Sequence, residues 1–233
     1  RADAAGAPAL MPLYEAVAWF TDLPNDEIAT LFSDHPPHLL AFFAAALWLV
    51  PALTYVTGFD QTATDIRSRY LRFLLLRVDR TTIYVGRALT TLIVIGVGYA
   101  LALLLLAWLM LGVEGGLGGA VGIAYLGRVW LCVLLFTLPF VMLLAWTNTL
   151  TGHPYMALAL AIGLQFGLWV TSAIGGWMEI GALEYAQQLF PTAYKYNLLS
   201  DDLELFGTGA LHQLGLAAAF AALGWRSFGR RDV

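Results

Sequence analysis

Charged residues are scarce in this chain. Only 12% of its 233 residues are Asp, Glu, Lys or Arg, whereas soluble domains carry about 25%. Hydrophobic residues make up 60% of the sequence, and the mean hydropathy is +0.73. This composition excludes an ordinary soluble domain and indicates a membrane protein.

Lysine and cysteine are almost missing as well. Lys195 is the only lysine, and it lies between two tyrosines. A P-loop needs a lysine between glycine and Ser or Thr, so the chain has no P-loop, and any ATP that it uses is hydrolysed by another chain. We therefore expect no cofactor on this chain. Cys132 is the only cysteine, which excludes an internal disulfide, and its apolar surroundings favour a buried core residue.

Long apolar runs dominate what is present. About 20 apolar residues are needed to cross a bilayer, and five runs meet that length, at roughly 39–59, 89–112, 125–147, 155–177 and 209–226. The sequence therefore predicts an all-α, polytopic membrane helix bundle, with residues 1–233 forming a single transmembrane domain. Because the chain begins at Arg1, we also expect a sixth span before it, and a cleaved signal peptide is the alternative.

The distribution of Lys and Arg predicts the orientation. If residues 60–88 and the C-terminus face the cytoplasm, nine of the twelve basic residues lie inside, as the positive-inside rule requires. Residues 1–38 and 173–208 then form outer loops. The net charge is −4 and the basic cluster lies between apolar spans, so nucleic acid is not an expected partner.

Half of the basic residues lie between positions 65 and 87. Six arginines at the bilayer centre would cost roughly 15–20 kcal/mol, so this segment is expected at or below the membrane surface. Residues 60–76 predict one surface helix, which begins near Asp60. Its predicted apolar stripe consists of Ile66, Tyr70, Phe73 and Leu74, and three arginines beside the stripe are predicted to reach lipid headgroups: Arg67, Arg69 and Arg72. Asp79 is then predicted to cap a second helix that runs into the next span.

A sequence of short motifs resembles the membrane subunit of type-2 ATP-binding cassette exporters. The motifs are Asp60 after a span, "LLLR" at 74–77, the turn Val78-Asp79, an "R-x-x-I-x-x-G-R" pattern over 80–87, and the terminal "FGRRDV". The chain departs from the family at Val78, where proline is frequent, and at "TDIRSRY", where a Glu-Arg pair and a glycine are frequent. These departures leave the subgroup and the substrate open.

The resemblance implies that residues 77–87 dock into a groove of a cytoplasmic ATPase, which holds the ATP and magnesium. The residues expected to couple are Arg77, Asp79, Arg80, Thr81, Thr82 and Arg87. It also implies a homodimer or heterodimer of permeases in the bacterial inner membrane, and short helices forming a lid within 173–208. The alternative is that the arginines only set the topology and bind anionic lipid.

Other candidate sites carry weaker signals. "HPPH" at 35–38 suggests a metal site, but no third ligand is nearby, and a stiff turn is the favoured interpretation. Two amphipathic helices are predicted before it, at Leu13 to Thr21 and Asn25 to Phe32. The acidic residues of 173–208 favour a solvated loop over catalysis. Gln165, near the middle of a span, favours interhelical hydrogen bonding over substrate contact.

Three functions compete on this sequence. The leading hypothesis is a non-catalytic permease subunit of an exporter, working in the lipid bilayer with separate ATPase chains. The second is a non-transporting membrane subunit that transmits ATPase force to a partner machine outside the membrane. The third, a membrane-embedded enzyme, is disfavoured because no span contains paired carboxylates or a metal triad.

Overall fold

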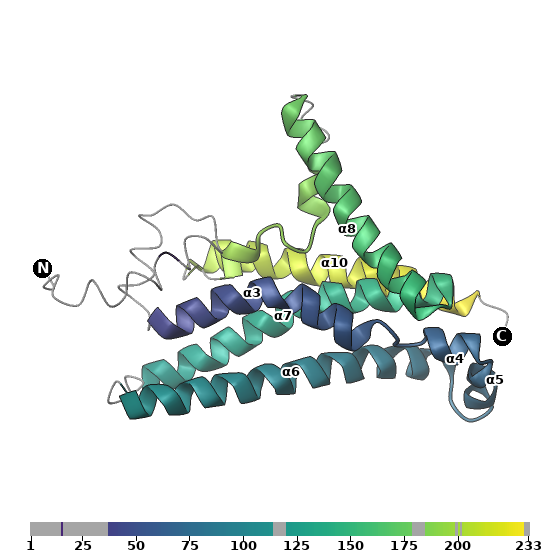
Figure 1. The fold of residues 1–233 in the computed structure, drawn as a ribbon, viewed down its shortest axis with the longest axis horizontal. Coiled ribbons are helices and arrows are strands. Elements are labelled where there is room, and N and C mark those ends of the chain that lie inside the picture. Colours follow the sequence, from purple (N-terminus) through teal and green to yellow (C-terminus); the bar gives the residue numbers. More distant parts are fainter. Residues whose placement is uncertain are drawn as a thin grey trace, which may run out of the picture. The chain divides into compact units, whose positions relative to one another are not determined.

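A computed structural model describes residues 15, 37–113, 120–178, 185–198, 200 and 202–230 of the chain. Its regular elements are all helical (Figure 1), and no strand occurs among the described residues. They are α3 (Pro37–Gly58), α4 (Ala63–Arg67), α5 (Tyr70–Leu75), α6 (Arg80–Val113), α7 (Ala120–Thr151), α8 (Pro154–Trp177), the short 3-10 helices η2 (Tyr185–Leu189) and η3 (Lys195–Leu198), and α10 (Leu203–Gly229).

Five of these helices are long and apolar enough to cross a membrane: α3, α6, α7, α8 and α10. The predictions of an all-α fold and of five spans are therefore confirmed, and these helices indicate a multi-pass membrane protein. Helix α6 has 34 residues, which corresponds to a length of about 51 Å. Since the hydrocarbon core is about 30 Å thick, an untilted α6 extends beyond it. The part of α6 that extends into water is expected to be its first two turns, because these contain Arg80 and Arg87.

The described residues form two compact units, which divide α3, α6 and α7 between them. Unit 1 contains the first part of α3, the second part of α6 and the first part of α7. Within it, the Tyr99 ring meets the Phe42 ring edge-on at 6.5 Å, and Trp130 Nε1 donates a hydrogen bond to the Gly96 carbonyl at 2.9 Å. Aromatic side chains thus join all three helices of unit 1, within a core that also contains buried aliphatic residues such as Leu39 and Leu103.

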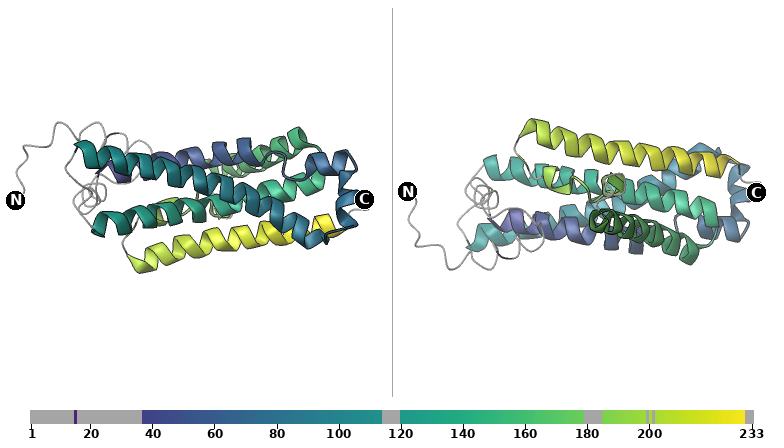
Figure 2. Two further views of the ribbon diagram at one scale, coloured as in Figure 1. Left: turned by 90° about the horizontal axis from the view of Figure 1, so that it is seen from below. Right: turned by 90° about the horizontal axis from the view of Figure 1, so that it is seen from above.

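Unit 2 (51–95 and 134–233) contains the arginine segment. Figure 2 shows α10 alongside the second part of α7 in both views. There the rings of Trp146 and Phe220 stack at 5.9 Å, beside a buried apolar cluster of Leu143, Leu144 and Ala161. Helix α10 is thereby packed on α7 near its C-terminal end.

The arginine segment differs from its prediction in two respects. The single surface helix over 60–76 is wrong, because Arg69 adopts a left-handed conformation (φ 58°) that ends α4 and redirects the chain into α5. The four residues of the predicted stripe do not share one face either, since Ile66 and Leu74 pack against a buried cluster with Leu71 while Tyr70 and Phe73 are 50% and 66% exposed. Burial of Leu71 by the rest of unit 2 therefore determines which face of α5 turns inward.

The predicted boundaries hold elsewhere with small shifts. A helix that starts at Arg80 and continues into the next span is confirmed by α6. The segment 173–208, which was predicted to be an outer loop, contains the short helices η2 and η3, which pack on α8 and α10, and it overlaps the ends of both long helices. Buried Gln213 of α10 donates to the Pro191 carbonyl at 2.7 Å, which fixes this region on α10. Both predicted amphipathic helices before residue 37 lie outside the described residues, apart from residue 15.

Candidate functional site

Two aspartates start the helices of the arginine segment. Asp60 accepts hydrogen bonds from the Thr64 backbone N–H at 2.9 Å and from the Thr64 hydroxyl at 2.7 Å. Asp79 likewise accepts from the Thr82 N–H at 3.1 Å and from its hydroxyl at 2.8 Å. These bonds confirm the predicted cap at Asp79, and they hold the pKa of its carboxyl below the ordinary value, the Thr82 hydroxyl contributing most. Asp60 is thus a helix-starting residue, with both carboxylate oxygens engaged.

Three of the six arginines are used inside the protein. Arg67 Nη1 lies 3.2 Å from His153 Nε2 in the turn between α7 and α8. Arg80 Nη1 donates to the Phe228 carbonyl at 3.1 Å and more weakly to that of Gly229, at the end of α10. Arg87 forms an ion pair with Asp65 of α4. Each of these arginines therefore ties together two elements of unit 2.

The other three arginines point outward. Arg69, Arg72 and Arg77 are exposed, and their side chains have no ion pair or hydrogen bond with any described residue. Between them lie exposed apolar side chains: Tyr70, Phe73 and Leu76, the last of which is 82% exposed. We call these six residues, Arg69, Tyr70, Arg72, Phe73, Leu76 and Arg77, the α5 outer face. It combines positive charge with uncovered aromatic surface.

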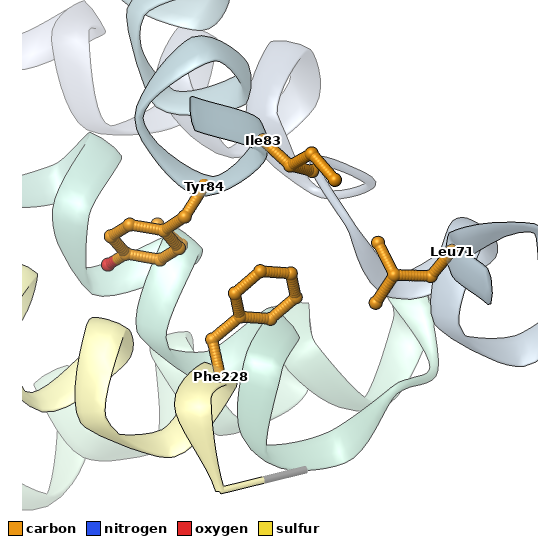
Figure 3. Close-up of a cluster of buried hydrophobic side chains, with 5 residues drawn as sticks. Leu71, Ile83, Tyr84 and Phe228 are labelled. Carbon is orange, nitrogen blue, oxygen red and sulfur yellow. The ribbon is translucent and has the colours of Figure 1, made fainter. Parts of the chain in front are cut away.

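The inner face of α5 belongs to a buried cluster at the base of α6 (Figure 3). Leu71, Tyr84 and Phe228 come from α5, α6 and α10, and the close-up shows their side chains turned toward one another. Ile83 and Ala145 complete the cluster. Four helices therefore meet there, and this places residues 60–88 at the same end of unit 2 as the C-terminus of α10, as predicted.

The remaining predicted coupling residues lie next to this cluster. Thr81 accepts a hydrogen bond from Trp225 Nε1 of α10 at 3.2 Å, while Thr82 is bonded to Asp79. Among the six predicted coupling residues, only Arg77 belongs to the α5 outer face. The others make contacts within unit 2, and whether any of them also binds a partner stays a prediction.

Gln165 lies in α8, inside a helix long enough to span the membrane. Its side chain interacts with that of Tyr55 in α3, although neither the buried Nε2 atom of Gln165 nor the Tyr55 hydroxyl makes a hydrogen bond of standard geometry with a described residue. Gln165 thus contacts a neighbouring helix, in line with the predicted interhelical role.

Three further features are candidate sites: metal-binding groups, the acidic residues near α10 and a pocket in unit 1. No group of three or more His, Cys, Asp or Glu side chains in the described part of the chain is arranged to hold a metal. Asp202, one of the acidic residues of the outer region, caps α10 by accepting from the Glu204 N–H at 2.9 Å. An open pocket of about 230 Å³ in unit 1 is lined by apolar side chains and glycine: Ala100, Leu103, Leu104, Leu126, Gly127 and Trp130. It offers no reactive group.

Sequence reasoning missed the contribution of α10 and of the α7–α8 turn. His153, Gly224 and Phe228 each contact the arginine segment or the base of α6. Nothing in their spacing indicates these contacts, because they join positions more than 70 residues apart. Comparison with protein-family models, curated proteins and solved structures found no match to this chain.

Proposed function

We propose that the chain is the membrane subunit of an ATP-binding cassette exporter, and that the α5 outer face receives the ATPase. The observation that carries this proposal is the division of the arginine segment into three arginines with internal partners and three that point outward. The motif resemblance, the five candidate spans and the continuous helix α6 support it.

The composition of the α5 outer face suits a protein partner. Arginine forms bidentate contacts with carboxylates, and aromatic side chains and arginine are enriched in the centres of protein interfaces. Tyr70 and Phe73 are 50% and 66% exposed, so their rings are uncovered beside the arginines. An acidic groove on the ATPase that also has apolar pockets would match both features.

Transmission from this face follows from its connections. The face lies directly before Asp79, and α6 continues without a break from Arg80 to Val113. Because α6 is one helix, a displacement at its base is carried along its length. The ion pair between Arg87 and Asp65 also fixes α4 to α6, so the arginine segment moves with the helix.

Co-purification of the chain with a cytoplasmic ATP-binding cassette ATPase from the same cells tests the proposal. We expect Arg72→Gln combined with Arg77→Gln to lower co-purification sharply while membrane insertion persists, because both charges face outward. The matched control neutralises two exposed arginines of the C-terminal end, Arg226→Gln with Arg230→Gln, which adds no negative charge at the C-terminus of α10, and it should retain the ATPase. Retention by both variants would refute docking at the α5 outer face. Equal loss from both would indicate a general basic surface, such as one that binds anionic lipid.

A further inference from the structure

The last turns of α10 are bonded to the base of α6. Arg80 binds the Phe228 carbonyl, the Tyr84 hydroxyl donates to the Ala221 carbonyl at 3.4 Å, and Trp225 donates to Thr81. These contacts extend over about one turn of α6, residues 80–84, and about two turns of α10, residues 221–228. Two of the bonds run from α6 side chains to α10 carbonyls, and one runs from an α10 side chain to α6. The end of α10 is therefore bonded to the start of α6 at several points.

Gly224 sets how closely the helices approach. A Cβ atom built on Gly224 would overlap the Tyr84 hydroxyl oxygen, and it would lie 3.1 Å from Cα of Trp146 in α7. The Thr149 hydroxyl of α7 also lies 3.5 Å from the Gly224 carbonyl oxygen. Helices α6, α7 and α10 therefore converge at a position where any larger residue would displace a neighbour, and we call this contact the Gly224 joint.

The α5 segment reaches α10 as well as α6. Leu71 is buried in the same cluster as Phe228, whose ring centroid lies 6.0 Å from that of Tyr84. Phe228 itself is 1% exposed. Because packed interiors transmit displacement rather than absorb it, movement of α5 displaces Phe228 together with the base of α6.

We infer that the arginine segment drives two spans, α6 through the chain itself and α10 through the Gly224 joint. This inference rests on the proposed function, since it requires an ATPase to move the segment. It assigns Gly224 and Tyr84 as positioning residues for coupling. They hold α10 on the moving base and have no contact with substrate or ATP.

The experiment reports movement at the far end of α10. Glu204 is exposed and lies in the first turn of α10, 20 residues before Gly224 in the sequence, so it reports on the opposite end of the helix. In a Cys132→Ala background, a Glu204→Cys substitution is alkylated by a water-soluble maleimide in nanodiscs that contain the bound ATPase. We expect the alkylation rate to change on addition of ATP, and Gly224→Ala to remove that change while ATPase binding and ATP hydrolysis continue.

Two further variants make the result specific. Gly215→Ala is the matched control, because it makes the same replacement in α10 where a Cβ meets nothing within 4 Å, and it should keep the ATP-dependent change. Gly224→Ala combined with Tyr84→Phe removes the overlapping hydroxyl and should restore at least part of the change. If Gly224→Ala alone fails to insert, Trp225→Phe, which loses only the bond to Thr81, should reduce the change.

The outcomes separate this inference from the proposed function. Absence of a co-purifying ATPase from the unmodified chain is a failure of the proposed function itself. With the ATPase bound, the two-span inference is overturned if residue 204 does not respond to ATP in the unmodified chain. It is likewise overturned if Gly224→Ala leaves the response intact, or if Gly215→Ala abolishes it equally.

Discussion

The anchoring of α5 by Leu71 yields a quantitative prediction. Helix α5 has only six residues, and a helix this short has no stability of its own in water. Its position therefore depends on the side chains that it buries. Leu71 is 0% exposed, whereas Leu76 at the end of the same helix is 82% exposed. Leu71→Ala and Leu76→Ala thus make the same chemical change in opposite environments.

The expected magnitudes differ widely. Burial of a leucine contributes about 1.5–3 kcal/mol, and Leu→Ala in a core costs about 2–5 kcal/mol. Leu71 is held by a helix of six residues, which can shift to fill part of the space that the smaller side chain leaves. We therefore expect Leu71→Ala to cost about 2–3 kcal/mol, near the lower end of that range. Since about 1.4 kcal/mol corresponds to a tenfold change, local opening of residues 70–76 should rise roughly 30- to 140-fold. Leu76→Ala should change it by less than about twofold, as surface substitutions usually do.

Hydrogen exchange of the whole chain in nanodiscs measures this difference. Protection of the amides of 70–76 should fall in Leu71→Ala, with the amides of α7 around Leu144 unchanged as an internal reference. Equal protection in the two leucine variants would show that α5 is not anchored by the buried cluster. The reasoning would also fail if the loss of protection spread through α7, because the effect would then be global.

Two more predictions concern the residues between α5 and α6. Arg80→Gln should lower the free energy of unfolding by about 1 kcal/mol, because the charged hydrogen bond to the end of α10 is lost. The variant should still co-purify with the ATPase. Loss of the ATPase at unchanged stability would contradict an internal role of Arg80. The Asp79 carboxyl has a lowered pKa in the folded protein. The ionised carboxylate therefore stabilises the start of α6 fully above the pKa of the unfolded chain, about 4. This stabilisation is lost as the pH falls through the lower pKa of the folded protein. Protection of the Thr82 amide should accordingly fall on acidification in the native chain and stay level in Asp79→Asn, as followed by hydrogen exchange corrected for its intrinsic pH dependence.

The sequence was sufficient to predict the features that depend on local composition. Apolar runs of adequate length predicted all five spanning helices, and an aspartate before Arg80 predicted the start of α6. The α4–α5 break was not predictable in the same way. Periodicity favoured one continuous surface helix with Ile66, Tyr70, Phe73 and Leu74 in a single apolar stripe. In the structure the chain breaks between α4 and α5, and Leu71 is buried in a cluster with Ile83 and Phe228. That burial depends on the C-terminal end of α10, which is about 150 residues away in the chain.

The roles of adjacent Asp79 and Arg80 show what composition alone does not reveal. A helix N-terminus carries partial positive charge and a C-terminus partial negative charge. Asp79 lies at the N-terminus of α6, and Arg80, the next residue, binds carbonyls at the C-terminus of α10. One dipeptide thus supplies each of two helix ends with a charge of the favourable sign. Exchanging the signs at 79 and 80 would place an unfavourable charge at both ends, so loss of ATPase binding in that variant would follow from a disturbed base as readily as from a lost docking contact. Docking is therefore tested at Arg72 and Arg77, whose side chains have no such internal role in the described residues.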